Sequence, residues 1–132
     1  MEDGQNSNPL LRLVAGNEPI DLELLANILE PYVQLHTEPP HPEYTWDGEH
    51  LNNKKKILAY LLARKALLEL HLIETDKVSP STIEADTKIP GGSIRPVLKD
   101  LREKKLVREN DGYFVPNNAI KQVQKLFEGA DE

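Results

Sequence analysis

Apolar and polar positions alternate most clearly between residues 79 and 105, where two short helices and a tight turn are predicted. Ser79 followed by Pro80 starts the first helix, because serine can cap free N–H groups and proline needs no partner there. The segment KIPGG over 88–92 ends this helix, since proline and glycine continue a helix only at high cost. Ile89 lies inside the turn, so we expect it to plug into the core.

A second helix is predicted over residues 93–105, with Ser93 as its cap and Pro96 still within its first turn. Apolar positions recur along it at helical spacing and define its inward face. These positions are Ile94, Val97, Leu98 and Leu101.

A short β-hairpin is predicted after the second helix. The segments 106–109 and 113–115 flank Asn110-Asp111-Gly112, in which Asp-Gly suits the positive φ angles of a hairpin turn. Lys77-Val78 can add a further short strand. A last helix then starts at Asn117 or Asn118 and packs back onto the domain.

The first half of the chain predicts an amphipathic helix over 19–35, which Pro31 ends or kinks. Residues 36–51 carry three prolines and no periodicity, so we expect an extended linker, pinned by the rings of Tyr44 and Trp46.

A long helix is predicted over 53–73, and its apolar residues spread well beyond the stripe of about 100° that one core requires. We therefore expect this helix to be buried on two sides. The expected partners are the N-terminal helix and a second copy of the chain, giving a homodimer through both helices.

Together these elements predict a mainly α fold with a small β-hairpin (α+β), consisting of one domain with an extra N-terminal helical segment. The expected organisation has five parts. They are a flexible acidic N-terminus over 1–18, the amphipathic helix over 19–35, the Pro-rich linker over 36–51, the main domain over 52–128 and a disordered tail over 129–132.

The charge distribution matters more than the total of −6. Residues 1–51 hold one basic and ten acidic side chains, whereas residues 52–127 hold fifteen Lys/Arg and nine Asp/Glu. A polyanion would feel the local basic field, because salt screens charges beyond about 8–10 Å. The chain has no cysteine, no long apolar run and no secretion signal, so a cytoplasmic protein is expected.

The outward side of the helix over 93–105 is cationic, as an element that enters a DNA groove must be. The residues on or near this side include Ser93, Arg95, Lys99 and Arg102. An ordinary solvated basic face would show the same pattern. Lys54, Lys55 and Lys56, at a helix end where cations are unfavourable, suggest an anionic neighbour or a solvated cluster.

The stretch IPGGSIRPVLKDLREKKLV followed by DGYFVPNNAI resembles the winged helix-turn-helix of small prokaryotic, archaeal-type transcriptional regulators. The resemblance covers roughly residues 54–127 and leaves out the acidic first third. It implies that the helix over 93–105 is a recognition helix. The implied DNA-facing residues are Ser93, Arg95, Lys99 and Arg102, with Lys104, Lys105 and Arg108 on the DNA backbone.

No catalytic motif is identified, so an enzyme is not expected, and neither is a cofactor. His36, His41 and His50 with nearby carboxylates are the one cluster that could hold a metal, but their spacing matches no metal motif. The leading expectation is therefore sequence-specific binding of double-stranded DNA by a transcriptional regulator.

Two alternatives remain open. A winged helix can serve protein–protein contact within a larger complex, which the net charge of −6 favours. The acidic N-terminal third can also fold over the basic face and compete with DNA.

Overall fold

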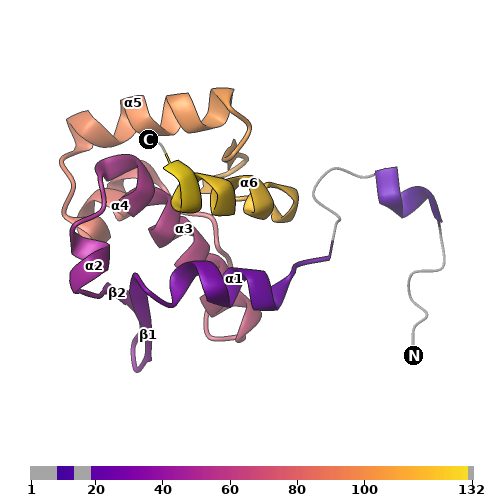
Figure 1. Ribbon diagram of the computed structural model, residues 1–132, viewed down its shortest axis with the longest axis horizontal. Helices are drawn as coiled ribbons and strands as arrows, with labels where there is room; N and C mark the ends of the chain where they lie inside the picture. Colours follow the sequence, from indigo (N-terminus) through magenta and orange to yellow (C-terminus); the bar gives the residue numbers. More distant parts are fainter. Residues whose placement is uncertain (1–8, 14–18, 131–132) are drawn as a thin grey trace.

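The computed structural model describes residues 9–13 and 19–130, and within them the fold is mainly helical with two small antiparallel hairpins (Figure 1). The expected α+β class is confirmed at this level. The helices and strands are η2 (Pro9–Leu13), α1 (Leu22–Leu29), β1 (Val33–Thr37), β2 (Pro40–Tyr44), α2 (Trp46–Glu49), α3 (Asn53–Glu69), α4 (Pro80–Thr87), α5 (Gly91–Glu103), β3 (Arg108–Glu109), β4 (Tyr113–Phe114), η3 (Asn117–Ala119), α6 (Ile120–Lys125) and η4 (Leu126–Ala130).

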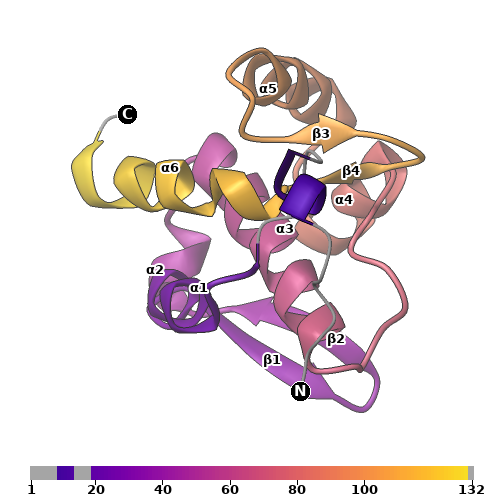
Figure 2. The ribbon, with the colours of Figure 1, turned by 90° about the vertical axis from the view of Figure 1, so that its right-hand side faces the viewer.

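Helix α3 is the centre of the fold. Every residue from Ile57 to Ala63 is buried, so the helix has no solvent face over these two turns. It packs against α1, the β1–β2 hairpin, α4, α5 and strand β4. Figures 1 and 2 show α5 at one end of the molecule and the β1–β2 hairpin at the other, with α3 between them.

The apolar surface of α3 is thus covered within a single chain, which removes the burial argument for a homodimer through this helix. The helix begins after Asn52, whose side-chain oxygen accepts a hydrogen bond from the Lys55 N–H at 2.9 Å. It ends at Glu69 rather than near Ile73, because His71 takes a left-handed backbone with φ 63°.

The expected linker over 36–51 is wrong as a description of this segment. Strands β1 and β2 form an antiparallel hairpin, and the short helix α2 follows it. The β2 prolines are tolerated because proline can lie in an edge strand with its nitrogen facing away from the partner. Tyr44 anchors the hairpin by donating a hydrogen bond to the Lys56 carbonyl at 2.6 Å, whereas Trp46 is 74% exposed and pins nothing.

The N-terminal helix is shorter than the 19–35 expected. Asp21 caps α1 by accepting from the Leu24 N–H at 3.0 Å, and the helix gives way to a turn at Glu30, before Pro31. It packs on α3 and α6, away from α5 in Figure 1, so α1 does not fold over the basic face. The expected flexible N-terminus and tail lie largely outside the described residues.

The α4–turn–α5 unit follows the predicted pattern closely. Ser79 caps α4 with Pro80 in the first helical position, and Lys88 ends it in a left-handed conformation with φ 67°. Ile89 is buried as expected and fills the space beside the turn. Helices α3, α4 and α5 pack against one another and hold α5 by its apolar side.

The second hairpin is tied to the segment before α4. Val78 exchanges two backbone hydrogen bonds with Tyr113, at 3.1 and 2.7 Å. This segment is held to α3 by a buried ion pair between Lys65 Nζ and Asp76 Oδ2 at 3.1 Å. The position of the hairpin therefore depends on the central helix as well as on α5.

We expect removal of residues 1–51 to abolish cooperative unfolding. The truncation deletes Leu25, Ile28, Leu29 and Val33 from the core. Burying such side chains contributes about 1.5–3 kcal/mol each, against a total stability of about 5–15 kcal/mol for a typical domain. Urea denaturation followed by circular dichroism measures the effect, and a sharp transition in the truncated chain would show that the first third is not core.

A second prediction concerns Tyr60, whose buried hydroxyl donates a hydrogen bond to the carboxylate of Asp86. Burial first, and this carboxylate second, raise the pKa of Tyr60 above its ordinary value of 10.0. A group with a raised folded pKa contributes stability below the unfolded pKa and loses it as pH rises further. Stability should therefore fall above about pH 10, and less steeply in Tyr60→Phe. Melting temperatures between about pH 8 and 11 test this, and equal slopes in both proteins would contradict it.

Candidate nucleic-acid interface

The exposed side of α5 carries a stripe of basic side chains. Arg95, Lys99 and Arg102 are all exposed, and their spacing of four and three residues places them on one face of the helix. The opposite face is fixed by Ile94, Leu98 and Leu101, which are buried in the core. The stripe is thus presented on a rigid element.

The start of α5 differs from the expectation. The helix begins at Gly91 after Pro90, and no side chain caps it. Ser93 is therefore a half-buried residue of the first turn, and its N–H donates to the Pro90 carbonyl at 2.9 Å. Pro96 then lies in the second turn, where its missing N–H removes the helical hydrogen bond to the Gly92 carbonyl.

The three cations of the stripe differ in their partners. Arg102 donates from Nη1 to Glu109 Oε1 of β3 at 2.7 Å. Within the part of the chain that the structure describes, Arg95 and Lys99 make no ion pair or hydrogen bond through their side chains. These two side chains are available for an anionic ligand.

Asp100 pairs with two lysines, Lys54 of α3 and Lys104 at the end of α5. Its Oδ2 lies 3.3 Å from Lys54 Nζ and 3.2 Å from Lys104 Nζ. The hydrogen bond from Lys104, followed by that from Lys54, holds the pKa of the Asp100 carboxyl below its ordinary value. Lys104 therefore contributes less free charge than its position predicts.

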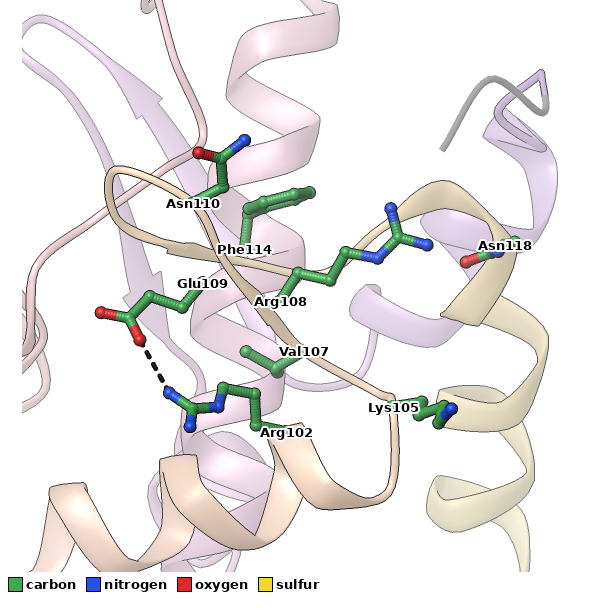
Figure 3. Close-up of a pocket in the computed structure, with 8 residues that line it drawn as sticks. All are labelled: Arg102, Lys105, Val107, Arg108, Glu109, Asn110, Phe114 and Asn118. Carbon is green, nitrogen blue, oxygen red and sulfur yellow. Dashed lines mark hydrogen bonds and ion pairs between the residues drawn. The ribbon is translucent and has the colours of Figure 1, made fainter. Parts of the chain in front are cut away.

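A groove of about 690 Å³ separates the C-terminal end of α5 from the β3–β4 hairpin and the start of η3 (Figure 3). In Figure 3 the Arg108 guanidinium extends toward Asn118, and Lys105 lies at the other side of the opening. The lining residues are Arg102, Lys105, Val107, Arg108, Glu109, Asn110, Phe114 and Asn118. The groove combines three cations and two amide side chains, which suit phosphate oxygens, with one carboxylate, which does not.

Two backbone features shape this groove. Lys105 ends α5 in a left-handed conformation with φ 65°, which turns the chain into β3. Asp111 and Gly112 have φ values of 60° and 123°, as a tight hairpin turn requires. The predicted hairpin forms with Arg108 opposite Phe114 and Glu109 opposite Tyr113.

The lysine cluster at the start of α3 faces carboxylates of its own chain. Lys56 Nζ lies 3.1 Å from Glu49 Oε1, and Lys54 pairs with Asp100. The anionic neighbour that the cluster predicts is therefore internal for these two lysines. This cluster does not extend the basic stripe of α5.

His36, His41 and His50, which the sequence offers as metal ligands, contact other side chains instead. His36 Nε2 lies 2.6 Å from Glu43 Oε1, the His36 and His41 rings stack, and His50 stacks on Trp46. Among the described residues, no group of three or more His, Cys, Asp or Glu side chains is placed to hold a metal ion.

Sequence reasoning missed five lining residues of the groove: Val107, Glu109, Asn110, Phe114 and Asn118. The sequence pattern predicts a turn at Asn110, a helix cap at Asn118 and a strand at Phe114, and none of these predicts a ligand contact. The signal that could have found them is the hairpin itself, because closing its turn brings both strands beside the end of α5. Of the residues implied by the resemblance, the structure brings Arg102, Lys105 and Arg108 together in the groove.

We expect Gly112→Ala to destabilise the hairpin. A Cβ there would lie 2.9 Å from Lys77 Cβ, and φ at this position is unfavourable for alanine. The loss should be about 1–3 kcal/mol. Gly92→Ala is the control, because a Cβ at Gly92 meets nothing within 4 Å. Urea unfolding measures both, and equal stability of the two variants would contradict this account.

None of the described helices is long and apolar enough to cross a membrane. Comparisons with protein-family models, curated proteins and solved structures found no significant match. Function is therefore inferred from the geometry and charge of this chain's own residues.

Proposed function

We propose that this protein binds double-stranded DNA sequence-specifically as a transcriptional regulator, with α5 in the major groove. The observation that carries the proposal is the exposed stripe of Arg95, Lys99 and Arg102 on a helix whose other face is buried. The order α4, turn, α5 and hairpin is that of a winged helix-turn-helix, which supports this docking geometry. In this proposal α5 is the recognition helix and β3–β4 is the wing.

The side chains divide into two roles. Arg95 and Lys99 read base edges, because they extend from the exposed face of α5 without partners among the described residues. Lys105 and Arg108 contact phosphates on either side of the groove, and Lys104, next to Lys105 in the chain, contacts the DNA backbone beside them. Ser93 contacts the DNA backbone, because it lies in the first turn of α5.

The net charge of −6 does not oppose this role. The acidic residues of α1 lie on an element that packs on α3 and α6 rather than on α5. Charges separated by more than about 8–10 Å are largely screened at physiological salt. The DNA would therefore respond mainly to the stripe and the groove.

A second candidate function is that of a protein-binding module within a larger complex. The observation that favours it is Trp46, which is 74% exposed and stacks on His50 at a ring-centroid separation of 3.9 Å. Aromatic side chains are enriched at protein interfaces. The exposed acidic turn at Asp111 also limits how closely the hairpin can approach DNA.

Dimer formation is a separate part of the proposal. Apolar burial of α3 does not require a second chain, so a dimer would have to use exposed residues such as Leu22 and Leu70, each 57% exposed. A two-fold DNA site would indicate two copies with symmetric half-sites, whereas a single half-site would indicate one.

Selection from a random pool of double-stranded DNA at two salt concentrations tests the function directly. We expect an enriched motif, palindromic for a dimer, with binding that weakens steeply as salt rises. Arg95→Ala should relax preference at one position by about 1–3 kcal/mol. Lys105→Ala should weaken all sequences about equally and reduce the salt slope by about 1.

Lys125→Ala is the matched control, because this exposed lysine lies on α6 outside the groove. It should leave both preference and salt slope nearly unchanged. Absence of enrichment at both salt concentrations would overturn the DNA-binding proposal in favour of the protein-binding module. Equal losses across sequences for Arg95→Ala and Lys105→Ala would refute the division of roles.

A further inference from the structure

Glu109 is the carboxylate that reaches the basic stripe of α5. Its Oε1 accepts a hydrogen bond from Arg102 Nη1 at 2.7 Å, between strand β3 and the last turn of the helix. Figure 3 shows the two side chains directed toward each other on the opposite side of the hairpin from Arg108. Both side chains are about half exposed, at 48% and 47%.

This ion pair involves only one of the three cations of the stripe, Arg102. Arg95 and Lys99 have no internal partner among the described residues, whereas Arg102 is held by a residue seven positions along the chain. Arg102 is also the stripe residue that lines the groove with Lys105 and Arg108. The free protein therefore presents the stripe and the groove with their shared cation already occupied.

We propose that the Glu109 carboxylate takes the place of a DNA phosphate on Arg102 in the free protein, so that DNA binding exchanges one anion for the other. The inference rests on the proposed DNA-binding function. It makes Glu109 a residue that sets affinity, although Glu109 itself touches no DNA.

The chemistry of the two anions supports this exchange. A guanidinium presents a planar fork of N–H donors that matches both carboxylate and phosphate oxygens. An exposed ion pair contributes little, because water screens it and holding two long side chains costs entropy. A phosphate on the duplex can therefore displace the carboxylate, because losing the ion pair costs little free energy.

The consequence of this exchange is that Glu109 lowers the affinity of the protein for DNA. While Glu109 holds Arg102, a passing duplex gains only from the remaining cations and is repelled by the carboxylate. Once α5 is seated, a phosphate beside Arg102 can replace Glu109. Because phosphates carry no sequence information, loss of this carboxylate should tighten binding to preferred and random duplexes by the same factor.

The test uses Glu109→Gln and a control, Asp111→Asn, in the full chain. Both substitutions remove one negative charge from the same hairpin. Asp111 lies at the turn with φ 60°, a conformation that asparagine also adopts readily. Arg102→Ala and the double variant Arg102→Ala/Glu109→Gln complete a double-mutant cycle. Fluorescence anisotropy with a labelled 20-base-pair duplex at low salt measures binding of each protein.

We expect Glu109→Gln to bind about three- to tenfold more tightly than the natural chain, from loss of a carboxylate beside the phosphate site. Asp111→Asn should change affinity less than about twofold, since Asp111 pairs with no arginine among the described residues. In the Arg102→Ala background, Glu109→Gln should lose most of its gain. The exposed positions of both acidic residues should leave the melting temperatures close to that of the natural chain.

Two results separate this inference from the function on which it rests. If the natural chain binds the duplex, but Glu109→Gln gains no more than Asp111→Asn or gains equally without Arg102, the exchange is overturned and DNA binding stands. If neither the natural chain nor Glu109→Gln binds at low salt, the DNA-binding function itself fails, and the exchange fails with it. Binding by Glu109→Gln alone would support both.

Discussion

Burial of α3 on every side is the constraint on which the rest of the fold depends. Because no turn between Ile57 and Ala63 faces water, each surrounding element must cover part of this helix. The first third of the chain covers one side, and the α4–α5 unit covers the other. The basic face of α5 is therefore the outer surface of an element that is required for the core.

The part of the fold that the sequence predicts best is the part with local signals. Ser79-Pro80, the KIPGG segment and Asp111-Gly112 each restrict the backbone directly, so α4, the turn and the hairpin follow the prediction, while α5 begins two residues earlier, at Gly91. The β1–β2 hairpin carries no such signal, because its prolines argue against strands and its stability comes from contact with α3. Tyr44 anchors the hairpin to Lys56, twelve residues further along the chain, and no local sequence pattern predicts this contact.

The sequence predicts which candidate site residues share a helix face, but it does not predict which of their charges are neutralised by other residues. Helical spacing places Arg95, Lys99 and Arg102 together, and the structure keeps all three exposed. Their electrostatic value depends on partners from other elements, as with Glu109, or on a shared carboxylate such as Asp100. Counting Lys and Arg over residues 52–127 therefore overstates the positive charge that a ligand would meet.

The two hydrogen bonds between Val78 and Tyr113 close the chain on itself at the base of the α4–α5–hairpin unit. Residues 79–112 thus form a loop of chain that is closed at its base, with its inner side chains in the core. The outer side chains of this segment can vary without disturbing the core, which is filled by Ile83, Ile94, Leu98 and Leu101. The shape of the scaffold is therefore set separately from the chemistry of its outer face.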